Sequence, residues 1–268
     1  MAPLVAAPGV GRNLQDHFGA FLALASRSPA TLYRQFRPDR AALALLRAWA
    51  NGTGPAASVP LEGGAFVRSR QGVDQADLKL TFVPGLSLEA SRRAQRRHGF
   101  LISVYPLRPE SRGSLQIAGP DPAAAPRIDP GYFSAAGDLA LLRDGMRLAA
   151  RIAANPALAR HAEGPLAPGP EALGSDAALE DWLRGHANTV FHPVGTCRMG
   201  TDTGAVVDPA LRVRGVEGLR VADASVMPRI VSANTSAPTM MIAEKAADLI
   251  LGRPAPAPLR PGANLSPR

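Results

Sequence analysis

Glycine and proline interrupt this chain so often that its regular elements must be short. The sequence has 26 of each among 268 residues, and no segment repeats along its length. Glycine suits tight turns, and proline lacks the backbone N–H that the interior of a helix or of a central strand requires. We therefore expect short helices and strands joined by many turns.

The periodicity of apolar residues predicts an α+β fold built on an antiparallel sheet. The runs DLKLTFV and SLQIA alternate apolar and polar residues, which is typical of half-buried antiparallel strands. The predicted strands cover residues 64–69, 78–84, 100–105 and 114–118. The predicted helices cover residues 40–50, 138–154 and 176–185. We expect the helices to pack on one face of the sheet.

Cap residues mark the ends of two helices. Ser175 is suited to the N-cap of the helix that follows it, because a serine hydroxyl accepts from free backbone N–H groups. A last helix is predicted near Pro238, with Ser236 or Asn234 as its cap, and Gly252 ends it.

Three further segments complete the expected organisation. Residues 1–17 have the composition of a loop. The stretch GLRVADAS, residues 218–225, shows little alternation, which predicts a strand covered on both faces in a parallel sheet. The proline-rich tail, residues 253–268, is predicted to be disordered.

The net charge of +8 does not indicate a nucleic-acid-binding protein. Of the 30 basic residues only Lys79 and Lys245 are lysines, and the arginines are scattered along the chain. The one basic cluster, SRRAQRRH at 91–98, contains no aromatic side chain that could stack on bases. An Arg-rich solvated surface is the favoured interpretation, with an anionic partner or a membrane surface as the alternative.

The single cysteine and the hydropathy pattern limit the remaining classes. Cys197 cannot form an intrachain disulfide, and we interpret it as a small buried residue rather than a nucleophile or part of a metal site. No run reaches the roughly 18 apolar residues of a membrane span, and residues 1–17 lack the pattern of an export signal. We predict a soluble cytoplasmic protein, with peripheral attachment to a membrane surface as the alternative.

Two polar residues stand out, and each has a structural and a chemical interpretation. His192 lies in FHPVGTCRMG, where the residues alone favour a histidine held in a tight loop over a catalytic base. Asn234 lies at the start of the last predicted helix, where backbone donors and the helix dipole favour negative charge. The residues alone favour Asn234 as a simple cap.

Four motifs in order resemble one family. PGVGRNLQDH, SRGSLQIAGPDPAAAPRIDPGYFS, FHPVGTCRMG and VVDPALRVRGVEGLRVADASVMPRIVSANTSAPTMMIAEKAADLI are similar to the glucose-methanol-choline (GMC) flavoprotein oxidoreductases, particularly the bacterial choline and alcohol dehydrogenases. The resemblance covers residues 8–252. It implies an FAD-dependent enzyme that oxidises a small alcohol.

The resemblance also implies an incomplete FAD site. Family members begin with a βαβ unit that carries G-x-G-x-x-G, and the glycines of PGVGRN follow no predicted strand. The chain therefore resembles a C-terminal portion, and we expect a remnant of an α/β FAD-binding domain beside a substrate-binding domain. The expected parts are an FAD-domain loop at 1–17, the substrate-binding domain at 18–189, and the rest of the FAD domain at 190–252.

The family pattern assigns roles to individual residues. It implies that His192 removes the hydroxyl proton while hydride passes to flavin N5, and that Asn234 holds the substrate oxygen. The two should lie side by side. The cofactor-binding residues implied by the resemblance are Asn13, Asp223, Ala224, Asn234 and Thr235.

Two other functions stay open beside this enzyme. One is a non-catalytic truncated product. The other is a subunit completed by a separately encoded FAD-binding half. No metal site is predicted, and the particular alcohol, the electron acceptor and the oligomeric state are left open.

Overall fold

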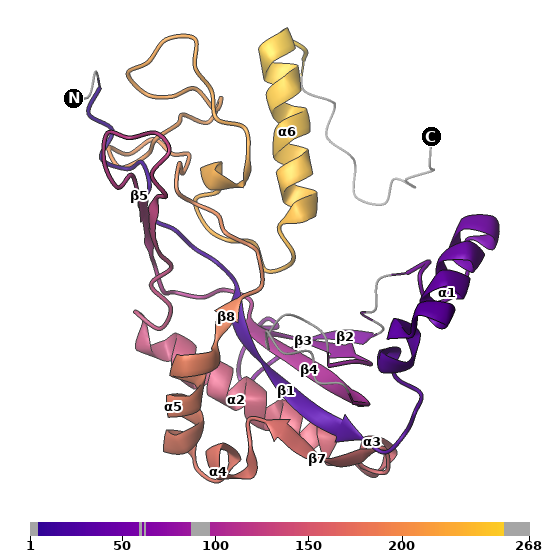
Figure 1. Cartoon of the computed structure of the whole chain (residues 1–268). Coiled ribbons are helices and arrows are strands. Elements are labelled where there is room, and N and C mark those ends of the chain that lie inside the picture. Colours follow the sequence, from indigo (N-terminus) through magenta and orange to yellow (C-terminus); the bar gives the residue numbers. More distant parts are fainter. Residues whose placement is uncertain (1–4, 59–60, 62, 87–96, 255–268) are drawn as a thin grey trace.

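The computed structural model of the chain describes residues 5–58, 61, 63–86 and 97–254. Figure 1 shows an antiparallel sheet with helices on one side of it, and a largely irregular region with the long helix α6 beyond one end of the sheet. The predicted α+β class is confirmed. The tail from residue 255 and the basic residues 91–96 lie outside the described part.

The sheet is antiparallel throughout, in the order β2-β3-β4-β1-β7, and β8 also pairs with β1. Ala20 of β1 lies opposite Val104 of β4, and Lys79 of β3 lies opposite Tyr105 of β4. The strands are β1 (Phe18–Ser26), β2 (Gly63–Val67), β3 (Leu78–Val83), β4 (Gly99–Pro106), β7 (Ala162–Ala167) and β8 (Asn188–Thr189).

One face of the sheet is covered by α2 (Ala136–Ala153), against which α5 (Asp176–His186) packs. Gly145 permits the close approach of α2, because a Cβ there would lie 2.6 Å from a methyl group of Val104. The resulting core is fully buried and joins both helices to three strands; it includes Leu22, Leu78, Val104, Leu142, Met146, Leu179 and Leu183. The short helices α3 (Pro156–Ala159) and α4 (Pro170–Leu173) precede and follow β7 along the chain.

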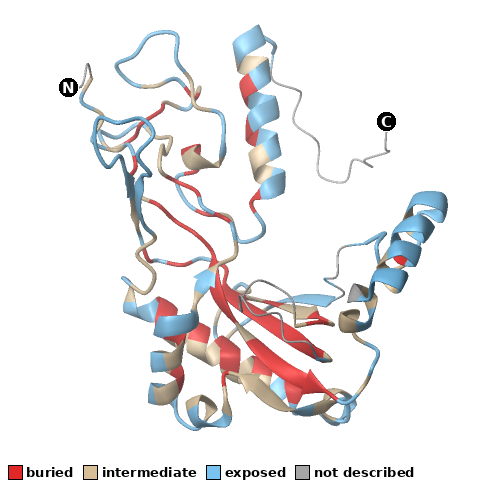
Figure 2. Cartoon of the chain, in the orientation of Figure 1, coloured by how far each residue is buried: buried red, intermediate tan, exposed pale blue. Residues whose placement is uncertain are grey.

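The opposite face of the sheet is more polar. Side chains alternate along a strand, so the residues between the core positions point to this face. Lys79 and Thr81 of β3 lie there, opposite Tyr105 and Ser103 of β4. The short helix η1 (Leu32–Phe36) and helix α1 (Pro38–Asn51) follow β1, and α1 stands off from the sheet with most of its surface exposed (Figure 2).

The second region, here called the coil unit, consists of residues 5–17, 113–129 and 190–254. It contains the hairpin β5 (Ser114–Gln116) and β6 (Arg127–Asp129), the short helix η2 (Ala224–Val226) and α6 (Ser236–Leu251). Isolated bridges tie its segments together, at Gln15 with Val194 and at Leu14 with Gly113. A small separate core fills it, with Val194, Val207, Leu211, Val226, Met227, Ile230, Ile242 and Ala246 among its members.

The predicted elements were found with shifted ends, and two predictions were wrong. The stretch 218–225 is not a strand, since it makes one bridge between Arg220 and Arg212 and then turns into η2. No neighbouring strand among the described residues pairs with it. The N-cap of α6 is Thr235, whose side chain makes no capping hydrogen bond, whereas Ser175 caps α5 as predicted.

Candidate active site

The candidate site lies where the coil unit meets the sheet. His17 immediately precedes β1, and His192 follows β8 in the returning loop. Gln15 and Val194 exchange two backbone hydrogen bonds, of 3.0 and 2.8 Å, and this pairing brings the two histidines together. His192 follows Phe191, whose φ of 65° turns the loop sharply. The local fold therefore fixes the position of His192 from both sides.

A continuous hydrogen-bonded series runs through the site. His17 Nε2 lies 3.0 Å from the carbonyl oxygen of Leu107, and the two Nδ1 atoms of His17 and His192 lie 3.0 Å apart. His192 Nε2 lies 3.2 Å from Asn234 Nδ2, and Lys79 Nζ lies 2.5 Å from Asn234 Oδ1. The predicted proximity of His192 and Asn234, 42 positions apart, is confirmed.

The carbonyl of Leu107 sets the proton positions along this series. A carbonyl only accepts, so His17 carries its proton on Nε2 and donates it to Leu107. Burial lowers the pKa of His17 to about 4, so the ring is neutral at pH 7 and its Nδ1 accepts. His192 must then donate from Nδ1, which leaves the lone pair of His192 Nε2 as the acceptor.

Lys79 orients the amide at the other end. An ammonium only donates, so the atom of Asn234 that faces it is Oδ1, and the Nδ2 group of Asn234 points to His192. Burial lowers the pKa of His192; the nearby carboxylate of Asp16 opposes this effect, and the charge of Lys79 adds to it. Neutral His192 thus presents an unprotonated Nε2 beside an amide donor.

Asp16 holds the backbone of the histidine loop. One carboxylate oxygen accepts from the backbone N–H of His192 at 3.0 Å, and the other accepts from the hydroxyl of Tyr132 at 2.7 Å. The residue is buried, and both of its oxygens are bonded. The carboxylate therefore positions His192 and adds negative charge behind it.

The residues predicted to bind the cofactor gather in the coil unit next to this pair. Asn13 donates from Nδ2 to the carbonyl oxygens of Gly195 and Pro228, so its side chain holds the loops together. Gly195 in turn donates to the carbonyl of Ala224 at 3.4 Å. A side chain at Gly195 is excluded, because its φ is 92° and a Cβ would lie 2.5 Å from the carbonyl oxygen of Asn13.

The other two predicted cofactor contacts lie at the starts of helical segments. Asp223 caps η2, with its Oδ1 accepting from the backbone N–H of Ser225 at 2.7 Å. Thr235 stands at the start of α6 directly after Asn234.

Cys197, predicted as a buried residue, is only partly buried. It packs against the core of the coil unit, and burial raises the pKa of its thiol.

Sequence reasoning missed four residues of this site. His17 and Asp16 stand in the quoted motif PGVGRNLQDH but received no individual role. Lys79 was noted only as one of two lysines, and this rarity in an arginine-rich chain was the available signal. Tyr105 is buried, no described atom bonds to its hydroxyl, and burial raises its pKa to about 12. Nothing in its sequence context marked it.

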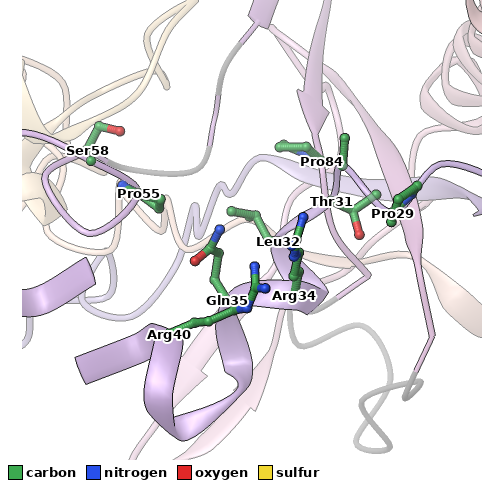
Figure 3. Close-up of a pocket in the computed structure, with 11 residues that line it drawn as sticks. Pro29, Thr31, Leu32, Arg34, Gln35, Arg40, Pro55, Ser58 and Pro84 are labelled. Atoms are coloured by element: carbon green, nitrogen blue, oxygen red, sulfur yellow. The ribbon is translucent and has the colours of Figure 1, made fainter. Parts of the chain in front are cut away.

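A cavity of about 450 Å³ lies elsewhere, between η1, α1 and the loop that follows it (Figure 3). Its lining includes Pro84, just after the end of β3 remote from the site, together with Leu32, Arg34, Gln35 and Arg40. It contains neither a histidine nor a carboxylate, so it does not compete with the histidine pair as a site for proton transfer.

In the described residues no helix has the length and apolarity to cross a membrane, and no three potential metal ligands cluster.

Comparison with known proteins identifies the family. The family model described as GMC oxidoreductase matches residues 109–243. A mitochondrial choline dehydrogenase of Homo sapiens is 40% identical over 250 residues, which are 92% of this chain and 42% of that protein. An alcohol dehydrogenase [acceptor] of Pseudomonas putida is 38% identical over 246 residues, which are 91% of this chain and 44% of that protein. The chain thus spans less than half the length of these curated relatives.

Solved structures share the fold. A pyridoxine 4-oxidase from Mesorbium loti superposes with a TM-score of 0.77 at 27% identity, over 95% of this chain and 46% of that one. A formate oxidase variant of Aspergillus oryzae superposes with a TM-score of 0.85 at 24% identity, over 94% of this chain and 49% of that one. The second likeness concerns the fold alone.

Proposed function

Because the chain belongs to the GMC oxidoreductase family, we propose that its site takes part in the FAD-dependent oxidation of an alcohol to an aldehyde or ketone. The observation that carries the proposal is the lone pair of His192 Nε2, which the series from Leu107 through His17 holds beside the amide of Asn234. FAD, when bound, supplies the hydride acceptor.

The residues present suit the ring side of a flavin. Helix α6 starts without a side-chain cap, so its first backbone N–H groups can donate to a carbonyl edge or to a negative charge. They stand directly after Asn234. Among the described residues no strand–glycine–helix unit of the kind that holds the adenosine half is found. The proposed FAD site of this chain is therefore a partial one.

His192 acts as the base in this proposal. Its Nε2 accepts the hydroxyl proton of the alcohol, and Asn234 Nδ2 donates to the oxygen that becomes negative. His17 keeps the proton of His192 on Nδ1, and Asp16 offsets the positive charge that the ring gains. Lys79 stabilises the negative oxygen through the amide but makes His192 a weaker base.

Replacing the base tests the proposal. In the complete FAD-loaded protein, His192→Ala should lower the rate of flavin reduction by an alcohol by ~10²-fold or more, as expected for lost general base catalysis. Stopped-flow absorbance measures the rate. His186→Ala is the matched control, because His186 is an exposed histidine at the end of α5. If both variants reduce flavin at the unmodified rate, His192 is not the base.

A further inference from the structure

On the face of the sheet opposite α2, the ammonium group of Lys79 lies over two aromatic rings. Lys79 Nζ lies 5.4 Å from the ring centre of Phe66 and 5.6 Å from that of Tyr105. Aromatic faces of this kind attract ammonium groups, including the quaternary ammonium of choline. In this protein the position is taken by the side chain of Lys79 itself.

No described carboxylate neutralises Lys79. The ion pairs of the described residues do not include it, and its hydrogen bond goes to the neutral amide of Asn234. The nearby acidic side chains are committed elsewhere. Asp77 bonds with both oxygens to Ser69, and Asp16 bonds to His192 and Tyr132.

Two groups on this face have hydrogen-bonding capacity left. An ammonium has three donors, and Asn234 uses one of those of Lys79. Across the strand pair, the buried hydroxyl of Tyr105 has no partner among the described atoms. Buried polar groups are normally bonded, so the hydroxyl of Tyr105 indicates a polar ligand. Lys79 is only partly buried, and its remaining donors are open to the same ligand.

We propose that the substrate of this site is an alcohol that bears an anionic group, a hydroxycarboxylate, whose carboxylate binds Lys79 and Tyr105 while its hydroxyl meets His192. This specificity rests on the proposed function. It separates the chain from relatives named choline dehydrogenases, because Lys79 repels a quaternary ammonium and its Nζ already lies over the rings of Phe66 and Tyr105. A second cation nearby, Arg108, bonds to Ser232 two residues before Asn234 and adds to the positive field.

Direct binding to Lys79 can be measured without turnover. The chain has two lysines, so ¹³Cε-lysine labelling gives two NMR signals, and Lys245→Met assigns them. Lys245 is exposed on α6 and serves as the internal control. Glycolate should shift the Lys79 signal in a saturable way and leave that of Lys245 in place. Ethylene glycol, its neutral counterpart, and choline should shift neither. An unmoved Lys79 signal with glycolate, or an equal shift with choline, overturns the anion site.

Turnover provides the second measurement. In the FAD-loaded protein, Lys79→Met should raise KM for glycolate relative to that for ethylene glycol by on the order of tenfold, the scale of one lost charge-assisted hydrogen bond. Lys245→Met should leave both values unchanged. Choline turned over with a higher kcat/KM than glycolate overturns the specificity. If no alcohol is oxidised at all, the proposed function fails, and the NMR shift decides the anion site separately.

Discussion

Helices α2 and α6 have similar lengths, but the two regions that contain them bury their side chains very differently. Of the 18 residues of α2, seven are buried, whereas α6 has 16 residues and buries Ile242 and Ala246. Met240, Met241, Ile250 and Leu251 of α6 are exposed apolar side chains. In Figure 2 the buried colour is concentrated in the sheet and the helices behind it.

The two regions contribute different residues to the site. The sheet supplies groups held by regular pairing, namely Lys79 and Tyr105, and the carbonyl of Leu107 that follows β4. The coil unit supplies His192 and Asn234 on loops, which polar contacts hold in place. Functional residues are often carried by loops on a rigid scaffold, because loops can present side chains that a sheet cannot.

The largest expected difference between the two regions is in the cost of a core deletion. Leu142→Ala, at a fully buried position of α2, should lower the free energy of unfolding by about 2–5 kcal/mol. Leu251→Ala, the same change at a position of α6 that is 60% exposed, should cost less than about 0.5 kcal/mol. Urea unfolding followed by circular dichroism measures both. Equal losses would mean that the surface of α6 is covered in solution.

The sequence predicted most of the sheet and its helices but not strand β1. The alternation of 78–84 was enough to place β3, and helical spacing placed α2 and α5. The strand β1 was missed, because FGAFLALAS is buried along nearly its whole length, shows no period of two and contains no β-branched residue typical of strands. Periodicity reports one exposed face, and β1 pairs with three other strands.

The sequence predicted those site residues that lie in recognisable motifs, but not those whose role depends on contacts made only in the folded chain. His192 and Asn234 came from quoted motifs, and the structure places them 3.2 Å apart. The roles of His17 and Lys79 depend on partners 90 and 155 positions away along the chain, Leu107 and Asn234. No local pattern encodes such a contact. The stretch 218–225 failed as a strand for a related reason, since a strand exists only through its neighbours.

His17, where the two regions meet, should make the stability of the fold depend on pH. The pKa of His17 is about 4 in the folded chain and 6.5 when unfolded, so the unfolded state binds the proton first as the pH falls. Stability present above pH 6.5 should therefore decline between pH 6.5 and 4, by on the order of 3 kcal/mol. Urea midpoints measured across this range report the loss.

Two histidine variants test whether this pH-dependent loss of stability arises at His17. His17→Asn should be less stable at pH 7.5 and should show a reduced slope, with His192, whose pKa is also lowered, supplying what remains. His186→Asn, at an exposed position, should keep the full slope. A full slope in the His17 variant would place the pH sensitivity outside the junction.

The smallest expected effect compares the starts of two helices, one in each region. The hydroxyl of Ser175 accepts from the backbone N–H of Ala178 at 3.1 Å, so Ser175→Ala should cost about 1 kcal/mol of unfolding free energy. Thr235 begins α6 without such a bond, so Thr235→Val, which replaces the hydroxyl with a methyl group, should change stability by less than about 0.5 kcal/mol. Chemical unfolding at pH 7.5, where His17 is neutral, measures both. A loss at Thr235 equal to that at Ser175 would mean that its hydroxyl caps α6 in solution, and the first turn would then have one donor fewer for the flavin.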